Sequence, residues 1–434
     1  MLDFLTRSEE FSRRLFLERA ASTCLGVSLL SAGRAFAAPA AKAVVQPAKG
    51  TAKAKNVIFL MMNGAFTHLD TFDLKPGREV QGETKGIDTT VPGMKFGEWL
   101  PGLAKHAQEL CVIRSLHTET GDHEQGSYLL RTSYPEIATI RHPGMGAWAM
   151  RLLGQRKDRT LPDNVLIGPE GRHPGAGFLE PTYTPIPIGD PLKGLQNTQS
   201  PAYLSESAFD KRLQLIDRFD TAFRKKYPQK QVEAYSEFYR QAASLMSSAD
   251  LKVFDLADEK QEVRDKYGMD AFGQGVLLAR RLVENDVRYV EVGLGGWDMH
   301  TDIYDKVGDK CGNLDKALSA LLEDLKSKGL LDQTLVVVGT EFGRTPKINQ
   351  NAGRDHHPAA FCALMAGAGM KGGQYYGKTD ENAFAVAEDP VTPADLNATI
   401  AQAMGLPLDK EIISKTGRPF KVAHDGKPLT KLMG

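Results

Sequence analysis

The chain has 434 residues, with 54 basic and 54 acidic side chains and a formal net charge of +0 at pH 7. This balance, together with the lack of a long basic stripe, excludes nucleic acid as its main partner. Hydrophobic residues make up 41% of the chain, and its mean hydropathy is −0.32. These values are typical of a soluble globular protein with a sizeable core.

The N-terminus has the features of a twin-arginine export signal. Arg13 and Arg14 precede a mild apolar stretch over residues 20–30, and Ala35-Phe-Ala37 forms a small-residue cleavage pattern. We therefore expect residues 1–37 to be a signal peptide read by the twin-arginine export machinery, and the mature protein to be periplasmic or secreted. The apolar stretch is shorter than the ~20 apolar residues of a membrane anchor. We expect no stable membrane anchor after cleavage.

A flexible linker is predicted to follow the signal, because residues 38–55 are rich in Ala, Lys, Pro and Val and have no period. Residues 56–434 are then expected to form a single domain. Within it, continuous apolar runs are typical of strands buried on both faces of a parallel sheet. These runs cover residues 56–62, 110–113, 287–292, 335–339 and 361–365.

Helical patterns lie between these predicted strands. Residues 208–256 carry apolar side chains at helical spacing, which predicts a buried stripe formed by Leu213, Ile216, Phe219 and Phe223. Helices are also predicted over residues 273–285 and 314–328, the second ending at Gly329. Alternating strands and helices predict an α/β fold, with a doubly wound, mostly parallel sheet flanked by helices.

The cysteines offer little chemistry. After cleavage the chain keeps Cys111, Cys311 and Cys362, and no C-x-x-C pair occurs. A structural zinc site built on thiolates is therefore excluded. We expect the three cysteines to pack in the core.

Histidines and acidic residues gather where the predicted strands end. Such sheets bind ligands beyond the carboxyl ends of their strands, so these side chains are expected to meet. Any one cluster is most simply a set of turn caps or satisfied core groups, but four clusters together favour a metal centre. The predicted metal ligands are His68, Asp70, Asp298, His300, Glu341, His356 and His357.

Several motifs in this order resemble the sulfatase-like family called domain of unknown function 1501, within the alkaline phosphatase superfamily. They cover residues 56–73, 175–179, 295–301, 340–346 and 353–358. The resemblance spans nearly the whole mature chain. It implies an alkaline phosphatase-like fold that uses one or two divalent metals to transfer phosphoryl or sulfuryl groups.

The resemblance also suggests roles for particular residues. Asp298 and His300 resemble the superfamily's Asp and His metal pair, and His356 or His357 resembles its later histidine ligand. Glu341 stands where relatives usually end a strand with Asp-His. The chain departs from the pattern at Asn63, where phosphatases have an aspartate before glycine, so that His68 or Asp70 would have to substitute.

A second departure concerns the nucleophile. The sulfatase Cys-x-Pro-x-Arg motif is absent, and the comparable helix start covers residues 121–127. His123 is the predicted nucleophile or general acid/base, with Ser127 behind it. Arg344 or Arg354 is predicted to bind a free anionic oxygen of the substrate.

The sequence therefore predicts an exported metal-dependent hydrolase of phosphate or sulfate esters, acting on a small-molecule or glycan-borne anionic ester. The expected cofactor is one or two divalent ions of zinc, manganese, calcium or magnesium. The alternative is a non-catalytic extracytoplasmic binding or assembly protein on a hydrolase-like scaffold, since a fold does not fix a function.

Overall fold

The computed structural model describes residues 53–154, 156, 160–169, 171–196, 205–226, 241–246 and 248–434. The predicted signal peptide over residues 1–37, and all of the predicted linker except residues 53–55, lie outside the described residues. Within the described ranges, no helix has the length and apolar character needed to cross a membrane.

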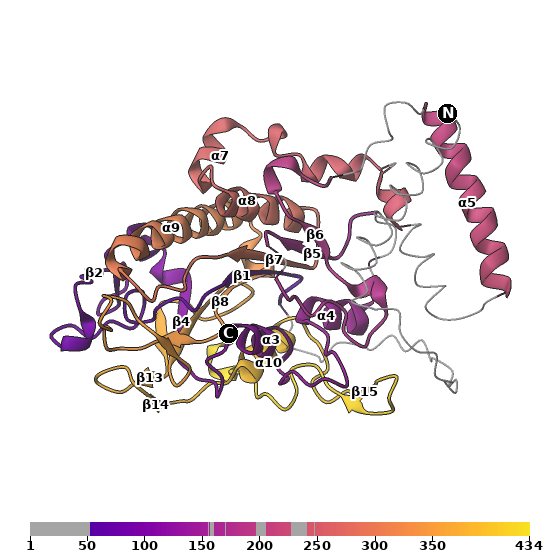
Figure 1. The fold of residues 1–434 in the computed structure, drawn as a ribbon. Helices are drawn as coiled ribbons and strands as arrows, with labels where there is room; N and C mark the ends of the chain where they lie inside the picture. Colours follow the sequence, from indigo (N-terminus) through magenta and orange to yellow (C-terminus); the bar gives the residue numbers. More distant parts are fainter. Residues whose placement is uncertain are drawn as a thin grey trace.

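An eight-stranded sheet forms the centre of the domain, in the order β12-β4-β11-β8-β1-β7-β5-β6 (Figure 1). Its strands are β1 (Asn56–Met62), β4 (Leu110–Leu116), β5 (Asn164–Ile167), β6 (Ile186–Ile188), β7 (Tyr289–Leu294), β8 (Thr334–Gly339), β11 (Phe361–Ala366) and β12 (Gln374–Tyr376). All run parallel to one another except β11, which is antiparallel to both β4 and β8. The predicted mostly parallel α/β sheet is confirmed, whereas the parallel direction expected for residues 361–365 is wrong.

Strand β1 shows why the sheet has a core on each face. Its side chains alternate, so that Ile58, Leu60 and Met62 belong to one buried cluster while Val57 and Phe59 belong to the other. Every residue of β1 is buried. A strand buried on both faces reads as a continuous apolar run, which is why the sequence identified it.

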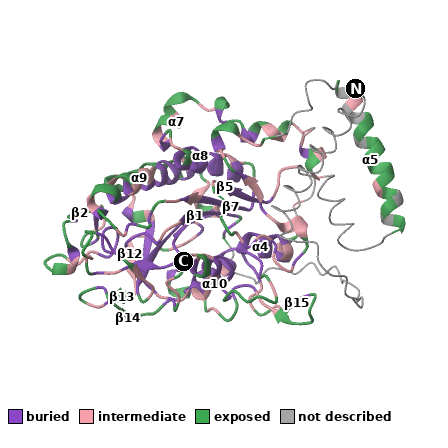
Figure 2. Cartoon of the chain, viewed as in Figure 1, coloured by how far each residue is buried: buried purple, intermediate pink, exposed green. Residues whose placement is uncertain are grey.

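Helices cover both faces of the sheet (Figures 1 and 2). On one side lie α2 (Pro101–Lys105), α7 (Gln261–Tyr267), α8 (Ala271–Glu284) and α9 (Ile303–Ser327), and on the other α3 (His123–Thr132), α4 (Met145–Leu153) and α10 (Pro393–Ala403). The predicted helices over residues 273–285 and 314–328 correspond to α8 and to the second half of α9. Helix α9 ends as expected just before Gly329, whose φ of 67° suits a glycine after a helix end.

The predicted long helix over residues 208–256 is only partly realised. Helix α5 (Glu206–Lys226) forms, but residues 249–254 are a 3-10 helix. In α5, Ile216 and Phe219 are 41% and 68% exposed, so the expected buried stripe is wrong at these positions. Helical spacing specifies an apolar face, but not which part of the molecule packs on it.

Four two-stranded ribbons complete the described structure. They pair β2 (Gly86–Asp88) with β3 (Lys95–Gly97), β9 (Gly343–Arg344) with β10 (His356–His357), β13 (Lys378–Thr379) with β14 (Val386–Glu388), and β15 (Ile412–Ile413) with β16 (Pro419–Phe420). The three cysteines, Cys111, Cys311 and Cys362, are free and buried, which confirms their packing role.

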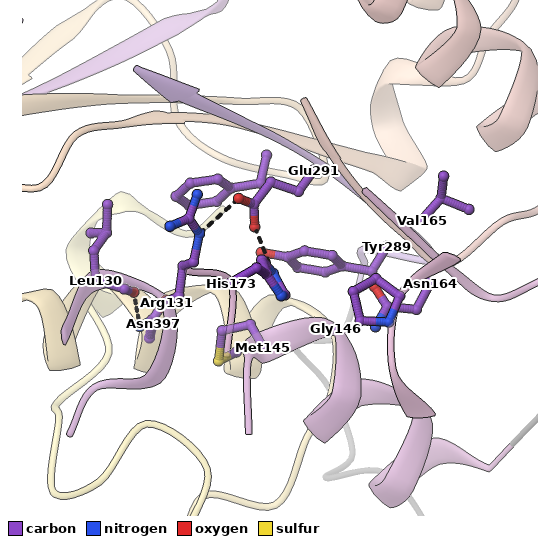
Figure 3. Close-up of a pocket in the computed structure, with 12 residues that line it drawn as sticks. Leu130, Arg131, Met145, Gly146, Asn164, Val165, His173, Tyr289, Glu291 and Asn397 are labelled. Atoms are coloured by element: carbon purple, nitrogen blue, oxygen red, sulfur yellow. Dashed lines mark hydrogen bonds and ion pairs between the residues drawn. The ribbon is translucent and has the colours of Figure 1, made fainter. Parts of the chain in front are cut away.

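A buried ion pair joins α3 to the sheet beside a small cavity of about 10 Å³ (Figure 3). The Arg131 side chain on α3 donates from Nε to Glu291 on β7 over 2.8 Å, and His173 Nε2 lies 3.4 Å from the other oxygen. Burial alone would raise the pKa of Glu291, but the charges of Arg131 and His173 lower it to about 2. The carboxylate is therefore ionised and ties α3 to the strand that leads to Asp298.

This pair makes stability depend on pH. The pKa of Glu291 lies below its ordinary value of 4.5 in the folded state, so its contribution is complete above that value and is lost as the pH falls toward about 2. Glu291→Gln, which leaves Arg131 buried without an ionised partner, should lower the free energy of unfolding by about 3–5 kcal/mol at pH 7. The deficit should shrink between pH 5 and pH 3, measured by urea denaturation.

The exposed Glu262 provides the matched control, because Glu262→Gln removes one acidic group without breaking a buried pair. That variant should follow the wild-type curve at each pH. A Glu291→Gln deficit that stays constant from pH 7 to pH 3 would contradict the stabilising role assigned to the ionised pair.

Candidate metal centre

The carboxyl edge of the sheet brings together four segments far apart in the sequence. Asp298 and His300 follow β7, Glu341 follows β8 directly, and His123 begins α3 after β4. His356 lies in β10, just before β11. Because β11 runs antiparallel to its neighbours, its beginning lies at the edge where the parallel strands end.

The start of α3 is fixed by a side-chain cap. The Asp122 carboxylate accepts hydrogen bonds from the backbone N–H groups of Glu124 and Gln125, each over 3.0 Å. This is the standard way to satisfy the free N–H groups of a first helical turn. It sets His123 at the first helical position, with its ring beside Phe342 and His356.

Three histidine nitrogens converge on one oxygen of Asp298. His300 Nε2 lies 3.0 Å from Asp298 Oδ1, His356 Nε2 lies 3.2 Å from it, and His123 Nε2 lies 3.3 Å from it. His300 Nε2 is also 3.0 Å from His356 Nε2. The ligand atoms of His123, Asp298 and His356 all lie within 4.8 Å of one another.

Each imidazole is oriented through its other nitrogen. In all three rings Nδ1 faces an oxygen acceptor, and with the hydrogen on Nδ1 each Nε2 presents its lone pair to the centre. Such acceptors behind histidine ligands are a regular feature of metal sites. The pairs are His123 with Glu341 Oε1, His300 with Asp355 Oδ1 and His356 with the carbonyl of Gly121, each at 2.7 Å.

The arrangement fits a divalent ion. Around an ion with bonds of about 2.0–2.1 Å to imidazole nitrogen, neighbouring ligand atoms lie about 3.3 Å apart in a tetrahedron and about 2.9 Å apart in an octahedron. The distances from Asp298 Oδ1 to the three nitrogens and from His300 Nε2 to His356 Nε2, between 3.0 and 3.3 Å, fall in that range. In addition, His123 Nε2 is buried and has no hydrogen-bond partner, an unmet need that an ion would satisfy.

Electrostatics keep the central carboxylate ionised. Burial alone would raise the pKa of Asp298, but the hydrogen bond and charge of Arg344, with help from His356 and His123, lower it well below the usual range. The hydrogen bond to Glu341 raises the pKa of His123, so that a proton competes with any metal for this ring. Asp298 and His300 are about half exposed, so the centre opens to solvent.

Arg344 lies beneath Asp298 and is almost completely buried. Its Nη2 donates to Asp298 Oδ1 and, over 2.6 Å, to the carbonyl of Gly64. Its Nε donates to the Ala65 carbonyl over 2.9 Å, and Nη1 donates to the Arg354 carbonyl over 3.1 Å. The guanidinium thus supports Asp298 and the loop after β1, and its role in binding a substrate oxygen stays a prediction.

Glu341 is engaged by protein donors. Its Oε1 accepts hydrogen bonds from the Gly64 N–H and from His123 Nδ1, both over 2.7 Å, and its Oε2 lies 2.9 Å from the Thr340 hydroxyl. With 1% of its surface exposed, it is a buried carboxylate satisfied without an ion. Glu341 therefore lies next to the centre, where it contacts Nδ1 of His123 and not the proposed ion position.

The predicted ligands His68 and His357 contact the backbone of residues 383 and 384 and not the ligand atoms of the centre. His68 Nε2 lies 3.2 Å from the carbonyl of Ala383, and His357 Nε2 lies 2.7 Å from that of Phe384. Burial lowers the pKa of His68 to about 4, so its ring is neutral. His356 and His357 are adjacent in β10, where successive side chains alternate in direction, and His356 is the one among the ligand atoms of the centre.

The predicted ligand Asp70 forms a fully buried ion pair with Arg354. Arg354 Nε donates to Asp70 Oδ2 over 2.8 Å, and both residues have no exposed surface. The hydroxyls of Thr67 and Thr84 donate to the same carboxylate over 2.7 and 2.5 Å. The pair holds the loop after β1 against the segment that carries Asp355 and His356, and neither side chain reaches the centre.

Ser127 follows His123 by one turn of α3 and is half-buried. None of the contacts that define the centre involves it. Sequence reasoning assigned no role to Asp355 in orienting His300, or to the Gly121 carbonyl. The sequence does not show that Asp355 contacts His300 or that the Gly121 carbonyl contacts His356, because hydrogen bonds between distant loops depend on the fold.

Two glycines permit the close packing of the loops. A Cβ atom on Gly64, whose φ is 109°, would lie 2.7 Å from the backbone nitrogen of Asp298. One on Gly353 would lie 2.1 Å from the carbonyl carbon of His300. These approaches require glycine, and they set the loop after β7 between the loops that follow β1 and β9.

Solved structures resemble the chain weakly. One is a protein in the alkaline phosphatase superfamily from Vibrio parahaemolyticus, 12% identical, with a TM-score of 0.40 over 89% of this chain and 72% of that one. The PsFucS1 sulfatase from Pseudoalteromonas sp. is 15% identical, with a TM-score of 0.37 over 81% and 68% of the two chains. The lipoteichoic acid synthase LtaP from Listeria monocytogenes is 8% identical, with a TM-score of 0.39 over 83% and 74%.

No curated protein matches the chain. The fold assignment rests on the order and direction of the strands in the central sheet. A protein-family model, in contrast, matches residues 54–433, a span that includes every residue of the centre. The chain therefore belongs to the family described as protein of unknown function DUF1501.

Proposed function

We propose that the protein is a metal-dependent hydrolase of phosphate or sulfate esters, and that Asp298, His356 and His123 or His300 hold its ion. The observation that supports this most directly is the convergence of three oriented imidazole nitrogens on Asp298 Oδ1. A purely structural cluster has no need to direct several nitrogen lone pairs at one carboxylate oxygen, since lone pairs repel one another without a proton or a cation between them.

The donor set narrows the choice of ion. Imidazole nitrogens suit zinc and other transition metals, whereas magnesium and calcium prefer a shell of oxygen atoms. A centre with two imidazoles and a single carboxylate therefore favours zinc, or manganese, over calcium and magnesium. A bound ion of this kind would polarise the ester oxygen and activate a water molecule.

The protein groups define how the ester is presented. Asp298 and His300 are half exposed, which leaves the centre accessible to a substrate from solvent. The Arg344 donors are directed at four protein oxygen atoms, and Nη1 also lies 3.5 Å from His300 Nε2, so its positive charge acts through the field and the ion is the proposed site of substrate contact. Water is the nucleophile in this proposal, because neither Ser127 nor a cysteine belongs to the centre.

Export through the twin-arginine route to the periplasm or beyond is part of the proposal. It is supported by Arg13 and Arg14, the apolar stretch and the small-residue pattern that follow them in the sequence. A protein exported by this route folds before it crosses the membrane. A metal centre assembled from four distant segments is compatible with such a route, because the protein is able to bind its ion before export.

Adjacent histidines in β10 give a matched pair of variants. His356→Ala removes a nitrogen of the centre and should reduce zinc affinity at least 100-fold and abolish hydrolysis of phosphate or sulfate esters. His357→Ala removes an equally large ring that contacts Phe384 instead, and should retain bound zinc. Metal content after gel filtration and turnover on phosphomonoester, phosphodiester and sulfate-ester panels measure both effects.

Each outcome of this comparison is informative. Equal loss of zinc in both variants would contradict the assignment of His356 to the centre. A wild-type protein that binds zinc but turns over none of the esters would support the binding or assembly alternative. A folded wild-type protein that binds no divalent ion would contradict the proposed function altogether.

Two aspartates with different roles give a second test. Asp298→Asn should remove bound zinc, and it should lower the free energy of unfolding of the metal-free protein by less than Asp70→Asn does, because Asp298 is half exposed whereas Asp70 is fully buried. Asp70→Asn leaves Arg354 buried without its anion and should cost about 3–5 kcal/mol. Chemical denaturation with chelator present, together with metal analysis of the folded protein, separates the two.

The folded fraction of Asp70→Asn should still bind zinc, since Asp70 bonds to Arg354 and two threonines rather than to the centre. Loss of zinc from folded Asp70→Asn, with unfolding energy unchanged, would instead place Asp70 among the ligands.

A further inference from the structure

We infer that the centre takes a single divalent ion, and that Arg344 supplies the second fixed positive charge beside Asp298. This inference rests on the proposed metal centre, and it concerns how many ions the centre holds. The sequence left one or two ions open. Four features of the described residues decide between these numbers.

The first feature is a shared nitrogen. His123, Asp298 and His356 form one set of converging ligand atoms, and His300, Asp298 and His356 form another. Both sets depend on His356 Nε2, while its Nδ1 bonds to the Gly121 carbonyl. An imidazole nitrogen has one lone pair in the ring plane and binds one ion. The two sets are therefore alternatives, and an ion in one prevents an ion in the other.

The second feature is that both oxygens of Glu341 already contact protein groups. Gly64 and His123 donate to Oε1, and Thr340 lies against Oε2. An ion at Glu341 would have to displace backbone and side-chain donors inside a buried site. The carboxylate instead stands behind His123, in the place where metal sites usually have an acceptor that orients a ligand.

The third feature is the position of the other predicted ligands. His68 and His357 face the carbonyls of Ala383 and Phe384, and Asp70 is paired with Arg354. In the part of the chain that the structure describes, the set of His123, Asp298 and His356 has no second, independent counterpart. Among the described residues His68 Nδ1 is also buried without a partner, but it does not belong to a second group of three converging ligand atoms that could hold another ion.

The fourth feature is the cation already present. The Arg344 guanidinium is 1% exposed and bonds to Asp298 Oδ1, the oxygen on which the histidines converge. It is held there by the carbonyls of Gly64, Ala65 and Arg354. Arginine stays charged in proteins, so this position carries a permanent positive charge. Any ion next to this oxygen is repelled by Arg344, and a second ion would in addition be repelled by the first.

Metal counting tests the inference. The purified chain, stripped with chelator and equilibrated with Zn²⁺, should hold one ion per chain by native mass spectrometry and elemental analysis. Two ions bound with similar affinity would overturn the inference while leaving the metal centre standing. No bound ion would overturn the proposed function together with it, so the two failures are distinguishable.

The variant Glu341→Gln tests whether Glu341 holds an ion of its own. If Glu341 only orients His123, the variant should keep one ion per chain with a Zn²⁺ affinity about 10–100-fold weaker, the usual cost of losing an outer-shell partner. His357→Ala should match the wild type in both number and affinity. A wild-type count of two that falls to one in Glu341→Gln would show that Glu341 holds a second ion.

A separate experiment tests the charge assigned to Arg344. It measures the binding of inorganic phosphate to the zinc-loaded protein by calorimetry. Arg344→Met should weaken phosphate binding at least 10-fold, and Arg344→Lys, which keeps a positive charge, should lose less. Zinc content and circular dichroism establish that each variant is folded. Equal phosphate affinity in the wild type and in folded Arg344→Met would refute the role of Arg344.

Discussion

One carboxylate oxygen, Asp298 Oδ1, is the point on which the centre depends. Three imidazole nitrogens and one guanidinium are directed at it from four segments of the chain. With the hydrogens on Nδ1, such a concentration of imidazole lone pairs around one carboxylate oxygen is unfavourable without a cation between them. The loops must therefore be held in place by the rest of the fold, and the surrounding structure shows how.

The support comes from buried polar contacts that do not touch the centre. Arg131 and Glu291 join α3 to β7, so the helix that presents His123 and the strand that leads to Asp298 move as one unit. Asp70 and Arg354 join the loop after β1 to the segment that carries His356. Buried charges are costly unless they are paired. Both pairs fix segments that carry proposed ligands, and the fixed ligand geometry offsets the free-energy cost of burying the charges.

Much of this arrangement could be predicted from the sequence, because continuous apolar runs show where the strands end. Continuous apolar runs located the strands that precede Asp298 and Glu341, and the rule that ligands gather beyond carboxyl ends then placed both residues at one edge. The antiparallel direction of β11 could not be predicted, since an apolar run does not show in which direction its strand runs in the sheet. That direction nevertheless explains why His356, which precedes its strand, meets residues that follow theirs.

Individual roles were harder to predict than positions. His356 and His357 are neighbours of identical chemistry, and only the pairing of β10 with β9 determines which of them joins the centre. Asp70 looked like a ligand because its partner, Arg354, lies 284 residues away. The apolar spacing in α5 likewise predicted a buried face that Phe219 does not have. In each case the missing information was a contact between distant segments.

Glu341 shows how such contacts change the chemistry of a residue. From the sequence, a carboxylate at a strand end beside a histidine-rich loop is a natural ligand. In the fold, the same carboxylate is closed off by Gly64, Thr340 and His123, and its charge acts through the His123 ring. This buried acceptor is held by the Gly64 N–H and favours the hydrogen on His123 Nδ1 before any ion arrives. In the proposed single-ion centre, the negative charge of Glu341 orients a ligand instead of holding a second ion.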